Sequence, residues 1–204
     1  MSELEAIGIN TLYILALINP ISKVSILASL SLEREDKRVR SLVAKSSVVA
    51  TGILFGTMIV GDFLLRSVFR VDLYSLQLAG GIVVFLMGLN ALRHGRFFEH
   101  KPETAIEDVA LVPLACPMIA GPATIAACIS LSVHQGMAIA GVSVLLALGI
   151  NHIIMMFSRE LGRLLDRFNI LGAIIRITGL IVMTIGTQMA LDGISAWIAS
   201  GKLL

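Results

Sequence analysis

The sequence is poor in charged residues. Of its 204 residues only 15% are Asp, Glu, Lys or Arg, whereas 56% are hydrophobic, and the mean hydropathy is +0.90. A soluble domain of this length cannot hide so much apolar surface. Because a membrane-spanning helix takes about 20 mostly apolar residues, the chain has room for six such helices and for no soluble domain of useful size beside them.

Cysteine, aromatic residues and catalytic motifs are also scarce. Cys116 and Cys128 lie twelve residues apart in one predicted helix, too far apart to pair, and neither has metal-ligand spacing. Aromatic residues make up 5% of the chain. A pocket that binds many different drugs is usually lined by more of them, so the composition gives little support to a drug pump. The sequence has no Walker loop, zinc triad or Ser-His-Asp set. We therefore expect no enzyme activity, no metal or other cofactor, and no nucleic acid partner.

What the chain does contain is a series of six apolar segments, at about 6–30, 43–65, 73–92, 109–131, 136–158 and 171–197. The first segment follows Glu3 and Glu5 and not the basic residues of a secretory signal, so we expect it to be retained as a helix. Eleven basic residues gather in the odd-numbered connections, against three on the other side. The positive-inside rule then places the odd-numbered connections in the cytoplasm and both termini in the periplasm.

The two halves of the chain resemble each other. The stretch from Gly81 to Gly88 matches the stretch from Gly179 to Gly186 at a separation of 98 residues, and Pro20 lies 97 residues before Pro117. This predicts one all-α transmembrane domain, 1–204, built from two three-helix repeats at about 1–95 and 105–200. Since three is odd, the second repeat enters the membrane inverted, as in many secondary transporters. The alternative is that such glycines serve only close helix packing.

Proline interrupts the first apolar segment at Pro20. A proline inside a helix lacks an N–H and clashes with the carbonyl four residues earlier, so it kinks or opens the helix. Asn19, Ser22 and Ser25 are placed to satisfy the freed backbone groups. Either this opened backbone lines a substrate site, or the helix is only kinked and the hydroxyls bond their own backbone. The matched break in the other half favours a site.

The fourth segment contains three prolines and Gly121, which one uninterrupted helix cannot accommodate. Unwinding over Ala120–Pro122 would expose the N-terminus of a half-helix near Ala123. Its free N–H groups and positive dipole end suit a carboxylate, and Thr124 in the first turn adds a hydroxyl.

Lys23 and Arg176 are the only basic residues well inside apolar segments, where no acidic residue lies at the same depth. For Lys23 we favour snorkelling to the headgroups, whereas for Arg176 an inward contact and snorkelling are equally open. His152 could couple transport to protons, but a helix-packing hydrogen bond is favoured. The predicted substrate-binding residues are Asn19, Pro20, Ser22, Ser25, Pro117, Ala120, Gly121, Pro122, Thr124 and Arg176.

Three stretches together, Leu17–Lys23, Pro113–Pro122 and Gln188–Ile194, resemble the MarC family, a group of six-helix bacterial inner-membrane proteins, and the resemblance covers essentially the whole chain. The family commonly has a second proline five residues after the first. Pro122 fills that place after Pro117, but Ser25 stands in the matching place after Pro20. The family also often has Gly where Ser22 stands.

Some members of this family are described as neutral amino acid transporters. The resemblance thus implies a multi-pass protein of the bacterial inner membrane that carries a small zwitterionic solute, similar to alanine, glycine or serine, bound at the two broken helices near the midplane. Its other partner is membrane lipid. An exporter of another small metabolite or drug and a non-transport membrane protein are the alternatives. The coupling ion (H+ or Na+), the direction of transport and a homo-oligomeric state are left open.

Overall fold

The computed structural model describes residues 2–24, 27, 36–68, 70–95, 110–167 and 170–201, and within these ranges every regular element is a helix. The predicted all-α class is therefore confirmed. In chain order the helices are α1 (Glu3–Ile18), α3 (Asp36–Phe63), the π-helix η1 (Leu64–Val68), α4 (Leu73–His94), the π-helix η2 (Ala110–Ile119), α6 (Pro122–Gln135), α7 (Met137–Met156), α8 (Ser158–Arg167) and α9 (Leu171–Ala199). Residues 20–24 form a further helical turn after α1.

Within the described part of the chain, five helical stretches are long and apolar enough to cross a membrane: Glu3–Val24, Lys37–Gly61, Leu73–His94, Met137–Met156 and Leu171–Ala199. They correspond to the first, second, third, fifth and sixth predicted segments. The fourth predicted segment is divided, because η2 ends at Ile119 and α6 begins at Pro122. Proline is well suited to the first position of a helix, where its missing N–H leaves no bond unmade, and poorly suited to the interior.

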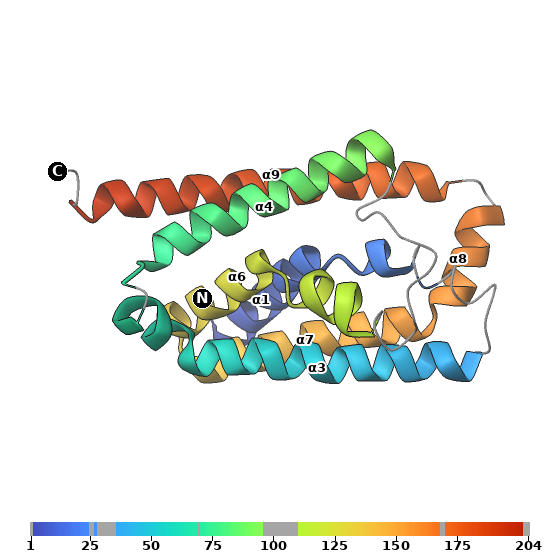
Figure 1. The fold of residues 1–204 in the computed structure, drawn as a ribbon, viewed down its shortest axis with the longest axis horizontal. Helices are drawn as coiled ribbons and strands as arrows, with labels where there is room; N and C mark the ends of the chain where they lie inside the picture. Colours follow the sequence, from blue (N-terminus) through green and yellow to red (C-terminus); the bar gives the residue numbers. More distant parts are fainter. Residues whose placement is uncertain are drawn as a thin grey trace.

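The connection between the fifth and sixth segments, which the sequence presents as a polar loop, contains α8. This short helix packs against α7 and α9 and lies across one end of the molecule (Figure 1). Ser158 and Gly162 are buried on one side of it, whereas Glu160, Arg163 and Arg167 are exposed. A helix with one charged face at the end of a bundle suits the boundary between membrane and water.

The helices form two layers. Figure 1 shows α4 and α9 side by side in one layer, and α1, α3, α6 and α7 in the other. In the larger layer α1 packs on α7, while α3 packs on η2, α6 and α7. The layers meet where α4 contacts α6 and where α9 contacts α1. The core of the larger layer consists of buried aliphatic side chains, among them Ile14, Ile18, Leu54, Ile119 and Val144.

Glycines bring α4 and α9 into backbone contact. A methyl group added to Gly81 would lie 2.6 Å from the carbonyl oxygen of Gly186, and one added to Gly88 would lie 2.6 Å from the carbonyl oxygen of Gly179. Along these contacts the residue numbers rise in α4 while they fall in α9, so the two helices are antiparallel. At this distance the two backbones make dispersion contacts that larger side chains would prevent. Helices in lipid commonly associate through such contacts between small residues.

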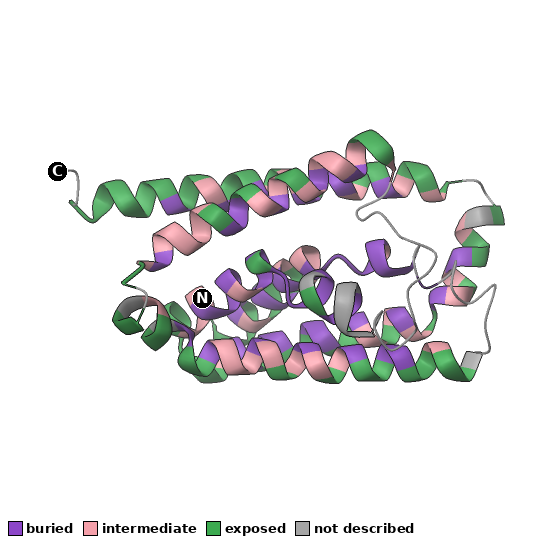
Figure 2. Cartoon of the chain, viewed as in Figure 1, coloured by how far each residue is buried: buried purple, intermediate pink, exposed green. Residues whose placement is uncertain are grey.

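Large apolar side chains cover the outer faces. Figure 2 shows exposed residues along much of α9 and on the outer side of α4 and α3. They include Val48, Ile59, Ile82, Leu86, Ile177, Ile181 and Leu191. A soluble monomer rarely exposes so large an apolar surface, whereas in a bilayer this surface contacts acyl chains.

The two ends of the molecule differ in charge. Both labelled termini lie in the half opposite α8 (Figure 1). The α8 end carries the start of α3, with Lys37, Arg38 and Arg40, as well as Arg93 at the end of α4. These described basic residues, which the sequence assigned to one side, thus lie at one end of the structure; Arg34, Arg96 and Lys101 fall outside the described residues.

Candidate functional site

The first break follows Ile18. Asn19 adopts the left-handed conformation, with φ 53° and ψ 78°, and its N–H donates to the carbonyl of Leu15 at 2.9 Å. Asparagine tolerates this conformation better than most residues with a side chain. Pro20 then starts the next helical turn with its fixed φ. Two hydrogen bonds to the carbonyl of Asn19 hold this turn: the N–H of Ser22 donates to it at 3.3 Å and the hydroxyl of Ser22 at 2.7 Å.

The side-chain amide of Asn19 is buried without a partner. The residue is only 5% exposed, and neither its Nδ2 nor its Oδ1 has a hydrogen bond within the described part of the chain. A buried amide that lacks partners costs free energy, of the order of 1–3 kcal/mol. In native proteins such a group usually has a partner, which here can be an ordered water or a bound solute.

The second break precedes α6. Gly121 caps this helix in an extended conformation, with φ −84° and ψ 167°, and Pro122 is its first residue. The sequence placed the start near Ala123, within one residue of the structure. The first helical bond is donated by Ile125 to Gly121 at 2.9 Å, and no side chain caps the helix. The N–H groups of the first turn therefore have no side-chain cap among the described residues, and they lie at the positive end of the helix.

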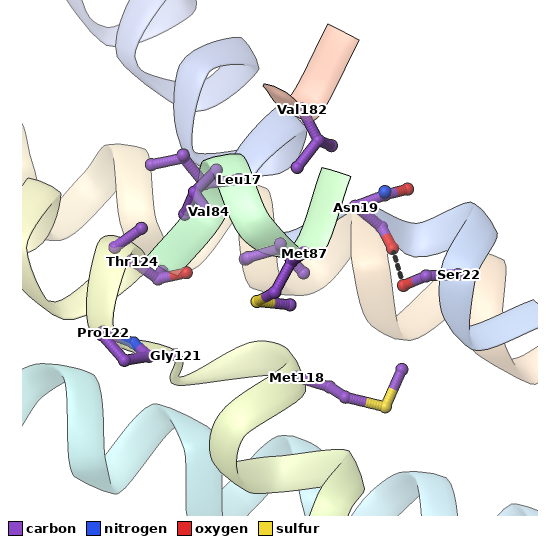
Figure 3. Close-up of a pocket in the computed structure, with 12 residues that line it drawn as sticks. Leu17, Asn19, Ser22, Val84, Met87, Met118, Gly121, Pro122, Thr124 and Val182 are labelled. Carbon is purple, nitrogen blue, oxygen red and sulfur yellow. Dashed lines mark hydrogen bonds between the residues drawn. The ribbon is translucent and has the colours of Figure 1, made fainter. Parts of the chain in front are cut away.

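The two breaks meet at one cavity. Figure 3 shows Asn19 and Ser22 on one side of it and Gly121, Pro122 and Thr124 on the other. Its volume is about 20 Å³, enough for a water molecule and too small for an amino acid.

Apolar side chains complete the wall of the cavity. They come from both layers, namely Leu17, Ile18, Met118 and Ala123 from the larger layer and Val84, Met87 and Val182 from α4 and α9. The lining from α4 and α9 was not foreseen, because membrane helices are apolar on every face and hydropathy does not separate a cavity face from a lipid face. One signal was present: Val84 and Val182 are themselves 98 residues apart, three residues after Gly81 and Gly179.

Five of the ten predicted site residues line this cavity, namely Asn19, Ser22, Gly121, Pro122 and Thr124. Pro20 and Ala120 are buried next to lining residues. Ser25 lies outside the described residues. Pro117 lies within η2, so it does not open a helix as Pro20 does; Pro122 takes that role in the second half. The observed breaks are therefore not at the positions that the 97-residue match between Pro20 and Pro117 would pair.

Arg176 is not part of the cavity lining. It is exposed near the start of α9, where its guanidinium lies beside Gly95 at the end of α4. The structure thus places it at the α8 end of the molecule, away from the two breaks.

Lys23 does not snorkel, so the sequence expectation for it is wrong. Its side chain is 0% exposed, and its ammonium donates to the carbonyls of Ile18 and Asn19 at the end of α1. The opened backbone is within reach of a side chain four or five residues further on, and this contact replaces the headgroups as its partner.

His152 has the packing role that the sequence favoured. Its Nδ1 and the hydroxyl of Ser47 are 2.8 Å apart and join α7 to α3. Among the described residues no group of three or more His, Cys, Asp or Glu side chains could hold a metal ion.

Comparison with known proteins agrees with the membrane fold. The model of the MarC family of integral membrane proteins matches residues 4–198. A UPF0056 membrane protein of Pyrococcus horikoshii is 34% identical over 190 residues, which are 93% of this chain and 94% of that protein. The UPF0056 inner membrane protein YhgN of Escherichia coli is 30% identical over 196 residues, 95% of this chain and 98% of that protein. No solved structure matches the chain.

Proposed function

Because this chain belongs to the MarC family of integral membrane proteins, we propose that it is a secondary transporter that carries a small neutral amino acid, such as alanine, glycine or serine, across the bacterial inner membrane. The single observation that carries the proposal is the cavity shared by two broken helices. Unwound backbone inside a membrane is tolerated where it lines a cavity, and transporters bind their substrates at such breaks.

The groups around the cavity complement a zwitterion. The first-turn N–H groups of α6 offer donors and a positive dipole end to a carboxylate, and the hydroxyl of Thr124 lies beside them. On the opposite wall the amide of Asn19 offers an oxygen that accepts from an ammonium and an NH₂ that donates to a carboxylate. The remaining wall is apolar and close, which suits a short, uncharged side chain.

The cavity must widen before it admits such a solute, because its volume of about 20 Å³ holds only water. Val84, Met87 and Val182 close it from the α4–α9 layer. The glycine contacts join α4 and α9 as one body. We propose that this layer shifts against the larger one to open the cavity, as one bundle moves against another in alternating access.

An inverted repeat of six membrane segments is part of the proposal, with η2 and α6 together forming the fourth segment. A shift of 98 residues carries Gly81 onto Gly179 and Gly88 onto Gly186. The contact of Gly81 with Gly186 is therefore equivalent to the contact of Gly179 with Gly88, as a two-fold axis between the halves requires. The packing of α1 on α7 likewise has a counterpart in the packing of η2 and α6 on α3. These paired contacts support two equivalent halves, and the basic α8 end supports a cytoplasmic position for that end.

Counterflow in liposomes tests this function. Purified protein is reconstituted into vesicles loaded with unlabelled alanine, glycine or serine, and the entry of the labelled amino acid is followed. We expect labelled solute to accumulate transiently above its equilibrium level, and to do so with at least one of the three. Leucine and glutamate, which are too large or charged for the cavity, serve as controls. If none of the small amino acids exchanges, the proposed substrate class is wrong.

A further inference from the structure

Lys23 is a fully buried lysine at the first break. Its side chain is 0% exposed, so the surrounding protein encloses it. Its ammonium donates to the carbonyl of Ile18 and, at 3.3 Å, to the carbonyl of Asn19. A charge placed at this depth is costly unless the protein supplies compensating groups.

Those two carbonyls are the negative end of a helix. Ile18 is the last residue of α1, and Asn19 turns out of the helix in the left-handed conformation. The N–H of Ser22, which would serve Ile18 in a continuous helix, is bonded to Asn19 instead. The C-terminal carbonyls of a helix carry about half an elementary negative charge between them, so they attract a cation.

The acidic side chains of the described residues take no part in this arrangement. Among the described residues no Asp or Glu forms an ion pair with Lys23, and its hydrogen-bond partners in this part of the chain are main-chain carbonyls. Carbonyl oxygens at the C-terminal end of a half-helix are the ligands with which transporters hold Na+. A lysine in their midst places a positive charge where such an ion would otherwise bind.

We propose that the ammonium of Lys23 is a tethered cation that fills the alkali-metal position of the α1 break, so that this break needs no bound Na+ or K+. Through the carbonyl of Asn19, which also accepts from the hydroxyl of Ser22 at 2.7 Å, Lys23 holds two residues of the cavity wall in place. Lys23 is thus a positioning residue. The assignment concerns the break itself and does not require that the protein transports an amino acid.

Thermal unfolding of the detergent-purified protein in different cations tests the assignment. The Lys23→Ala variant frees the two carbonyls, so we expect it to melt lower than the parent in choline chloride. Replacing choline by Na+, K+ or Li+ at constant ionic strength should raise its melting temperature in a saturable manner, because a metal ion now binds the vacated position. The parent and the Lys45→Ala variant, which lacks an exposed lysine of α3, should melt alike in all of these salts. Purely structural packing by Lys23 would lower the melting temperature of Lys23→Ala equally in every salt, and that result overturns the proposal.

Should Lys23→Ala not accumulate as folded protein, two further variants decide the question. Lys23→Arg keeps a cation, and Lys23→Gln keeps N–H donors without the charge. We expect Lys23→Arg to melt nearer to the parent than Lys23→Gln in choline. Equal melting of these two variants contradicts a role for the charge. Because none of these measurements requires solute, a failure of the transport assay leaves them interpretable.

Discussion

Gly81 of α4 faces Gly186 of α9 so closely that a methyl group on Gly81 would lie 2.6 Å from the carbonyl oxygen of Gly186. The reverse substitution meets the same barrier, since a methyl group on Gly186 would lie 2.7 Å from the carbonyl oxygen of Gly81. No real Cβ atom tolerates such distances from a backbone oxygen, so the two helices would have to separate. The layer that closes the cavity therefore depends on these glycines.

Replacing Gly81 by alanine should destabilise the protein by about 1–3 kcal/mol, the usual range for an overpacked contact. The same change at Gly149, where a methyl group would meet nothing within 4 Å, is the matched control on α7. We expect Gly149→Ala to be neutral or slightly stabilising, because alanine favours the helix. Thermal unfolding in detergent measures both variants. Equal stability of the two would show that the α4–α9 contact is looser than the structure has it.

Replacing Asn19 by alanine should weaken solute binding by about 1–3 kcal/mol, the usual effect of removing a buried hydrogen-bonding group from its ligand. The variant should remain folded, since the amide of Asn19 has no partner in the described protein to lose. Thr184→Ala on the exposed face of α9 is the control, because among the described residues its hydroxyl donates to the carbonyl of Leu180 within the same helix and lies away from the cavity. Titration of purified protein with alanine, followed by calorimetry or by tryptophan fluorescence, gives the affinities. An unchanged affinity in Asn19→Ala means that the amide does not contact the solute.

The position of the basic residues predicts the membrane topology. If both termini are periplasmic, as this prediction has it, a reporter that is active only in the periplasm should give a signal when fused after Leu204. The same reporter inserted between 33 and 38 should be silent, because that connection is assigned to the cytoplasm. The reversed pattern would contradict the orientation, and a signal at both points would contradict an odd number of crossings between them.

The helical segments and both breaks could be read from the sequence, because length, hydropathy and proline determine them directly. The glycine register was also visible, since Gly81, Gly88, Gly179 and Gly186 recur at one separation. Each of these signals is local: it depends on a residue type and its spacing, and not on which other helix lies opposite.

Three features depended on tertiary contacts and could not be read in this way. Pro117, which the 97-residue match pairs with Pro20, opens no half-helix, because it is accommodated within η2. Lys23 turns inward, where its ammonium donates to the carbonyls of Ile18 and Asn19 at the end of α1. The faces of α4 and α9 that line the cavity are as apolar as those that meet lipid, so hydropathy does not distinguish Val84 from Ile82.

The most direct test of the two-break site is alanine counterflow by Gly121→Leu compared with Gly149→Leu. Gly121 lines the cavity with a negative φ of −84°, so leucine meets no backbone strain there, but its side chain would stand beside the N–H groups of α6 and block the solute. Gly149 tolerates the same side chain in open space on α7. If the carboxylate binds between the breaks, Gly121→Leu should be folded in detergent and lose counterflow at least tenfold, while Gly149→Leu should retain the parental rate. Parental counterflow in both variants would place the solute elsewhere and leave the prolines as kinks alone.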